Sequence, residues 1–142
     1  MSSFKIFDIA GSGMSAQSVR LNTVASNLAN AESVSGDPAT VYRARHPVFE
    51  AVRAQVGAAA GLSRQAGAAV KVAGIVETDT APEMRYEPGN PLANAEGYVY
   101  APNVNTVEEM VDMISASRAY QNNIEVLNTS KDLLLATLRL GQ

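Results

Sequence analysis

The sequence predicts an α+β fold, in which long N- and C-terminal helices pack as a coiled-coil pair beside a small central antiparallel β-module. Apolar residues recur at helical spacing over residues 4–31 and again over 106–140. Between them, over 32–104, that period is lost and turn signals separate short β-prone runs. We therefore divide the chain into an N-terminal helix (1–31), a central β-rich module (32–105) and a C-terminal helix (106–142), with the two helices forming one coiled-coil core domain.

The N-terminal helix is predicted from a seven-residue repeat. Met14, Leu21 and Leu28 recur at this spacing, and Val24 widens the apolar stripe that they form. Glycine is a poor helix former, so Gly11 and Gly13 predict a bend or a break near residues 11–13.

The central region reads as short strands joined by turns. Gly36-Asp37-Pro38 is typical of a turn, and the alanine- and glycine-rich stretch 57–69 predicts a mobile loop. The strand candidates are residues 41–45, 70–76, 84–86 and 98–100, the last two separated by a turn-rich stretch at 87–91.

The C-terminal helix has the strongest pattern. Thr106 and Glu109 have the spacing of a capping box, and Gly141 follows the last apolar residue, where a C-cap glycine is expected. Val107, Val111, Ile114 and Leu135 widen the apolar face. Its heptad stripe is Met110, Met113, Ser117, Tyr120, Ile124, Leu127, Lys131, Leu134 and Leu138.

Two long amphipathic helices predict assembly, because an apolar stripe must be covered and the central module has few large apolar residues. Turns and helix caps explain Asn30, Asn103 and Asn105. Asparagines inside the helices (Asn22, Asn27, Asn122, Asn123) favour hydrogen-bonded helix interfaces. Ser117 and Lys131 are polar residues within the predicted stripe, where they can fix the register of the helix packing. For Lys131 the alternative is that its side chain lies along the stripe and keeps its ammonium group in solvent. The predicted assembly interface is Leu21, Asn22, Val24, Asn27, Leu28, Met110, Met113, Tyr120, Asn123, Ile124, Leu127, Lys131, Leu134 and Leu138.

Composition argues against other classes of protein. A net charge of −3 is unlike a nucleic-acid binder, and the absence of cysteine excludes disulfides and thiol chemistry. The N-terminus does not have the pattern of a cleavable signal peptide, so export would need another route. His46 is the single histidine and no acid–base or nucleophile set accompanies it, so we expect no catalytic site, cofactor, metal or small-molecule substrate.

Several segments resemble a known family. Residues 21–31 (LNTVASNLANA) resemble the N-terminal signature of bacterial flagellar rod and hook axial proteins. Residues 97–105, 108–121 and 125–142 are similar to the C-terminal part of short proximal-rod subunits of that family, so the resemblance covers essentially the whole chain.

This resemblance implies a structural subunit of the proximal rod. Such a subunit is exported unfolded by the flagellar type III system, without a cleaved signal peptide. It assembles helically in the periplasm with copies of itself and other rod proteins, above the membrane-ring base and export gate. The rod transmits torque, and the paired terminal helices line the export channel inside it, with the β-module outside.

Two alternatives use the same helical stripes. One is another short flagellar axial protein, and the other is a soluble coiled-coil adaptor or export chaperone. An adaptor would stay in the cytosol and form small closed oligomers, so the β-module and the need for export distinguish it from a rod subunit.

Overall fold

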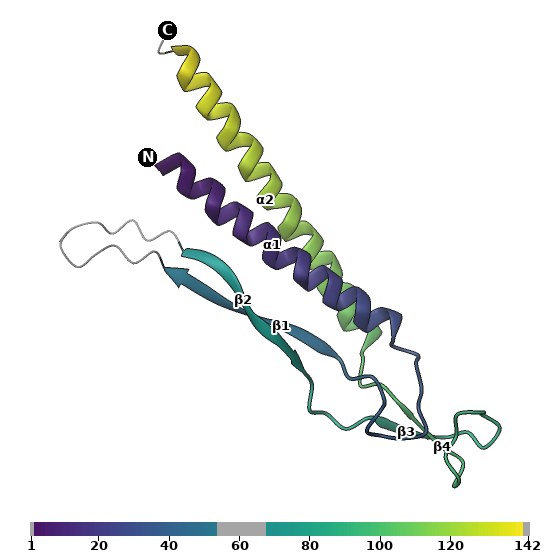
Figure 1. The fold of residues 1–142 in the computed structure, drawn as a ribbon. Coiled ribbons are helices and arrows are strands. Elements are labelled where there is room, and N and C mark those ends of the chain that lie inside the picture. The colour runs from purple at the N-terminus through teal and green to yellow at the C-terminus, as the bar shows by residue number, and fades with distance from the viewer. Residues whose placement is uncertain (1, 54–67, 141–142) are drawn as a thin grey trace.

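The computed structural model describes residues 2–53 and 68–140. Its elements are α1 (Ser2–Ala29), β1 (Arg45–Arg53), β2 (Ala68–Glu77), β3 (Glu83–Tyr86), β4 (Tyr98–Ala101) and α2 (Thr106–Leu140). The molecule is elongated: the outer ends of both helices lie together at one end, and β3 and β4 lie at the other (Figure 1). Two long helices with a central antiparallel β-module confirm the predicted fold class. Within the described residues, no helix combines the length and the apolar character that crossing a membrane requires.

Helix α1 is the central layer of the long part of the molecule. It packs antiparallel against α2 on one side and contacts the β1–β2 hairpin on the other (Figure 1). Ser12 fixes the hairpin to α1, because its Oγ accepts a hydrogen bond from the backbone N–H of Val70 (3.1 Å). The hairpin therefore leaves most of α2 uncovered.

The predicted break in the first helix is wrong, since α1 is continuous from Ser2 to Ala29. At Gly11 an added Cβ would meet nothing within 4 Å, whereas at Gly13 it would lie 3.0 Å from Nδ2 of Asn123 on α2. Packing against α2 holds this stretch helical despite its low propensity. Gly13 instead permits a close approach of the two helices.

The β1–β2 hairpin corrects two predictions. The strand expected at 41–45 begins only at Arg45 and runs on through Pro47 to Arg53. Val41 and Ala44 are buried in the connection that leads into it. Of the loop expected at 57–69, Ala68 and Ala69 belong to β2, and residues 57–67 lie outside the described part of the chain.

The pairing of the hairpin is antiparallel from Arg45↔Glu77 to Arg53↔Ala68, with an irregularity between Val48 and Phe49. The predicted strand at 70–76 is confirmed within β2.

Strands β3 and β4 form a second antiparallel pair, as predicted for 84–86 and 98–100. Ser35 extends this pair by bridging to Tyr100 on its other edge. Val99 is fully buried, so one face of the pair packs towards the body of the protein. An added Cβ at Gly36 would lie 2.6 Å from the backbone oxygen of Leu92, so only glycine fits where these two loops cross.

Helix α2 has the predicted extent, Thr106–Leu140, but its N-terminus is capped differently. Oδ1 of Asn105 accepts hydrogen bonds from the backbone N–H groups of Val107 (3.1 Å) and Glu108 (3.4 Å). The N-cap is therefore Asn105 and not Thr106, because Glu109 is drawn into a buried contact with α1. Gly141, the predicted C-cap, lies outside the described residues.

The core of the described molecule consists of small side chains. Its buried apolar residues are five alanines, three valines and one proline: Ala10, Ala16, Ala44, Ala101, Ala116, Val24, Val41, Val99 and Pro102. Small side chains let the helices approach closely, but they leave many large apolar side chains in solvent. A surface with so many exposed large apolar residues is typical of a subunit that packs against others.

Candidate assembly surfaces

A buried asparagine joins three segments where the two helices meet the hairpin. Nδ2 of Asn27 donates to the carbonyl of Arg45 (2.8 Å) and to Oε1 of Glu109 on α2 (2.9 Å). Its Oδ1 accepts from the hydroxyl of Tyr42 (2.8 Å) and from the backbone N–H of Arg45 (3.0 Å). All the hydrogen-bonding capacity of this amide is thus used inside the subunit.

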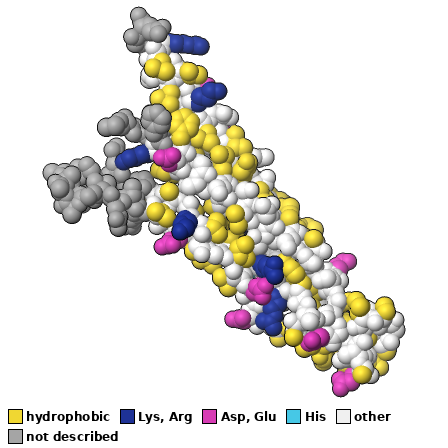
Figure 2. Space-filling view, viewed as in Figure 1, with side chains coloured by type: hydrophobic (Ala, Val, Ile, Leu, Met, Phe, Trp, Pro, Cys, Tyr) yellow, Lys and Arg dark blue, Asp and Glu magenta, His cyan; other side chains and the backbone are white. Residues whose placement is uncertain are grey.

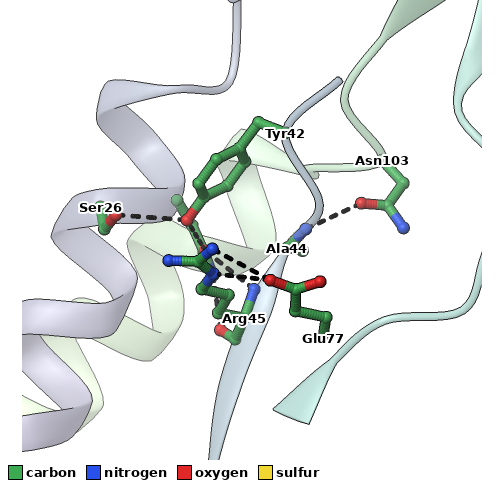
Figure 3. Close-up of polar contacts among 7 residues, drawn as sticks. Ser26, Tyr42, Ala44, Arg45, Glu77 and Asn103 are labelled. Atoms are coloured by element: carbon green, nitrogen blue, oxygen red, sulfur yellow. Dashed lines mark hydrogen bonds and ion pairs between the residues drawn. The ribbon is translucent and has the colours of Figure 1, made fainter. Parts of the chain in front are cut away.

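Residues that neighbour or bind Asn27 make further polar contacts, and Figure 3 shows those of Ser26, Tyr42 and Arg45. The hydroxyls of Ser26 and Tyr42 share a hydrogen bond of 3.2 Å. Nε and Nη2 of Arg45 both donate to Oε1 of Glu77, which ties the first residue of β1 to the last residue of β2 (Figure 3). The Ser26–Tyr42 bond thus links the segment before β1 to α1, and the Arg45–Glu77 bonds close the base of the hairpin.

Asn103, which follows β4, links the segment before β1 to the segment between β2 and β3. Its Oδ1 accepts from the backbone N–H of Ala44 (2.9 Å; Figure 3), and its Nδ2 donates to the carbonyl of Thr80 (3.0 Å). The interpretation of Asn103 as a turn-forming residue thus holds only in part, since its contacts are long-range.

Glu109 is a carboxylate buried between the helices, and only 4% of it is exposed. Its Oε2 has no hydrogen-bond partner among the described residues, and the same holds for Oε1 of Gln17 on α1. The partial positive charge at the start of α2 favours a carboxylate in this first turn. Farther along the helix pair, Arg20 donates to Asp112 across the interface (2.7 Å).

Helix α2 carries two heptad-spaced faces. The face towards α1, here called the inner face, contains only buried or half-buried residues: Glu109, Met113, Ala116, Tyr120, Asn123, Leu127, Ser130 and Leu134. The adjoining side, rotated by about 100° around the helix and here called the outer face, is almost entirely exposed: Val107, Met110, Ile114, Ser117, Gln121, Ile124, Asn128, Lys131, Leu135 and Leu138. Ser117 alone in this second set is half-buried.

The predicted α2 stripe is divided between these two faces. Met113, Tyr120, Leu127 and Leu134 lie on the inner face, as does Asn123. Met110, Ile124, Lys131 and Leu138 lie on the outer face and are exposed, with Met110 56% and Leu138 67% accessible. The single stripe read from the sequence is therefore two seams, one within the subunit and one facing solvent.

The predicted residues of α1 are also divided. Val24 and Asn27 are fully buried within the subunit, and Leu21 and Leu28 are half-buried. Asn22 is exposed, on a heptad-spaced row of small or amide side chains that face solvent: Ser15, Ser18, Asn22, Ala25 and Ala29.

Some residues of the site gave no signal in the sequence. Arg20 and Asp112 lie 92 positions apart, and Arg45 and Glu77 lie 32 apart, so nothing local pairs them. Glu109 had a local explanation, the capping box, which concealed its contact with Asn27.

The described residues contain no group of histidine and acidic side chains that could hold a metal ion. A depression of about 480 Å³ beside the turn at 33–45 is open and mostly polar. Its walls include Thr40, Arg43 and Glu77.

Comparisons with known proteins give family matches over both terminal helices. The family described as "Flagella basal body rod protein" matches residues 7–36, and "Flagellar basal body rod FlgEFG protein C-terminal" matches residues 95–140. The chain is 56% identical to the flagellar basal-body rod protein FlgC of Salmonella typhimurium over 142 residues, covering all of both chains. It is 55% identical to that of Escherichia coli O157:H7 and 35% identical to that of Bacillus subtilis, again covering all of both chains. The chain therefore belongs to the FlgC family of flagellar basal-body rod proteins.

Proposed function

We propose that this chain is a structural subunit of the proximal rod of the bacterial flagellar basal body. It acts by packing against neighbours and not by catalysis. The observation that carries this proposal is the outer face of α2, a second heptad-spaced seam that the subunit itself leaves in solvent. Membership of the FlgC family supports the basal-body rod as the assembly that covers this seam.

Neighbouring terminal helices are the natural occupants of this seam. At its start Val107, Met110 and Ile114 are between 55% and 69% exposed, and Val111 beside them is 60% exposed. At about 25 cal/mol per Å² of apolar surface, covering such side chains stabilises an assembly substantially. The assembly interface comprises the exposed residues Asn22, Met110, Ile124, Lys131 and Leu138, while the inner-face residues position them.

The finer role follows the family. The chain is exported unfolded by the flagellar type III system, without a cleaved signal peptide, and assembles helically with copies of itself and other rod proteins. A core of small side chains suits a chain that must unfold readily for transport. In the periplasm the rod meets the membrane-ring base and export gate, transmits torque and surrounds the export channel, with the terminal helices innermost.

Charge on the outer face tests this proposal. We expect the double variant Met110→Asp/Ile114→Asp to leave the isolated subunit helical by circular dichroism, because both side chains are exposed. Burying two carboxylates against apolar neighbours is costly, so electron microscopy of basal bodies should show incomplete rods, and the cells should not swim.

Ser115→Asp is the matched control, since Ser115 is exposed on α2 but lies outside the outer face. It should give complete rods and normal swimming. Complete rods containing the double variant at the normal level would contradict the proposal that this face is buried in the rod.

A further inference from the structure

The β3–β4 pair exposes an aromatic face at one end of the molecule. Met84 pairs with Tyr100 and Tyr86 pairs with Tyr98, so these four side chains share the face opposite buried Val99. The Tyr86 and Tyr98 rings lie 5.1 Å apart in a tilted arrangement. Met84 remains 57% exposed and Tyr86 65% exposed. Tyrosine and methionine are enriched in the buried centres of protein interfaces.

Hydrogen bonds hold the adjoining loop, residues 87–97, in one conformation. Oδ1 of Asn94 accepts from the N–H groups of Glu96 (3.0 Å) and Tyr98 (2.9 Å), and its backbone N–H donates to the carbonyl of Tyr98 (2.9 Å). Asn90 bonds to Glu87 and Leu92 in a similar way. A surface ordered in advance loses less conformational entropy on binding.

The segment that contains β3 and β4 is acidic. Between residues 78 and 101 the chain has four carboxylates, Asp79, Glu83, Glu87 and Glu96, and one basic residue, Arg85. Arg85 donates to Glu83 (3.0 Å). This bond, together with the nearby carboxylates of Glu87 and Glu32, raises the pKa of the Arg85 guanidinium above its ordinary value. One arginine thus balances only part of the local negative charge.

The opposite end of the molecule has complementary chemistry. Helix α2 extends past the start of α1, so its last turns have no helix beside them (Figure 1). Leu133, Leu135 and Leu138 are exposed there, and the flanking charges are Lys131, Asp132 and Arg139, a net positive set. Figure 2 shows acidic side chains around the β3–β4 end and basic side chains near the C-terminal end of α2.

We propose that the aromatic face of β3–β4 binds the C-terminal end of a terminal helix from an axially adjacent rod subunit, a helix end with exposed leucines and flanking lysine or arginine. The C-terminal family match, residues 95–140, includes this helix end, so other axial proteins of the family have the corresponding segment. Contacts between different surfaces at opposite ends of a subunit generate open helical assemblies. The inference rests on the proposed rod function and adds a specific axial contact to it.

Site-specific photocross-linking tests the contact. Position 86 is changed to p-benzoylphenylalanine (Tyr86→p-benzoylphenylalanine), basal bodies are purified and irradiated, and cross-linked peptides are identified by mass spectrometry. We expect the product to contain the last turns of the terminal helix of a rod subunit. Val76→p-benzoylphenylalanine, on the exposed part of the hairpin, is the control and should not give this product.

A cross-link from position 86 to a ring protein, to a β-module or to no protein in complete rods would overturn the inference. In a second measurement, Met84→Ser lowers the yield of the expected product by at least about tenfold, as for loss of an interface hot spot. An unchanged yield would count against the contact. Because the subunit must be present in purified rods for either measurement, failure of this contact is distinguishable from failure of the rod function.

Discussion

At the scale of single residues, the most consequential side chain is Asn27. An isolated polar group inside a protein costs free energy, but this amide makes four hydrogen bonds and joins α1, α2 and the start of β1. Residues 21–31, which resemble the signature of flagellar axial proteins, therefore contain a residue whose hydrogen bonds all lie within the subunit. It fixes the register of the two helices and so positions the outer face of α2.

Replacing Asn27 by alanine tests this role. The change leaves the carboxylate of Glu109 and two groups of Arg45 without their partner, so we expect a loss of about 2–3 kcal/mol in the free energy of unfolding. Asn22→Ala, at an exposed position on the same helix, should change it by less than about 0.5 kcal/mol. Urea denaturation followed by circular dichroism measures both, and equal effects would refute the internal role.

A second prediction separates the two candidate caps of α2. Asn105→Ala removes the acceptor for two backbone N–H groups and should cost about 1 kcal/mol, whereas Thr106→Ala should cost clearly less. Thermal unfolding of the two variants compares them directly. A larger loss for Thr106→Ala would restore the capping box expected from the sequence.

At the scale of elements, the helix pair depends on small residues at its closest approach. Ala16 and Ala116 are almost completely buried, and Gly13 faces Asn123. Here the sequence pattern misleads, because glycine is read as a helix breaker and not as a contact. The sequence pattern also combined residues of the inner and outer faces of α2 into one predicted stripe. Heptad spacing alone does not say which side of a helix contacts α1.

The two glycines of α1 provide a matched pair of variants. Gly11→Ala places a methyl group in open space, so the gain in helix propensity should stabilise the subunit by about 0.5–1 kcal/mol. Gly13→Leu makes the same gain but forces its side chain against Asn123, at a net cost of about 1–3 kcal/mol. Urea denaturation distinguishes them. Stabilisation by Gly13→Leu would show that the helices do not approach closely there.

At the scale of the whole molecule, the subunit is long, has a core of small side chains and exposes large apolar side chains on the outer face, on the β1–β2 hairpin and at the two ends. Stability is therefore uneven along its length. It is greatest around Asn27 and Glu109, where three segments meet, and least in the last turns of α2, which lack a partner within the subunit.

Hydrogen exchange on the free subunit tests this gradient. We expect backbone amides at 131–139 to exchange at least about tenfold faster than those at 110–120, because an isolated helix end frays without tertiary packing. In assembled rods the difference should shrink as neighbours cover the end. Strong protection of 131–139 in the dilute free subunit would contradict the proposed need for partners.

The sequence by itself determined the two long helices, the strands at 70–76, 84–86 and 98–100, and the likeness to flagellar axial proteins. These features depend on local periodicity and turn chemistry, which a single chain segment carries. Tertiary structure decided that the chain is helical through Gly11 and Gly13, that β1 starts at Arg45 and that Asn27 pairs with Glu109. Each of these depends on a contact between residues far apart in the sequence, and local patterns hold no information about such contacts.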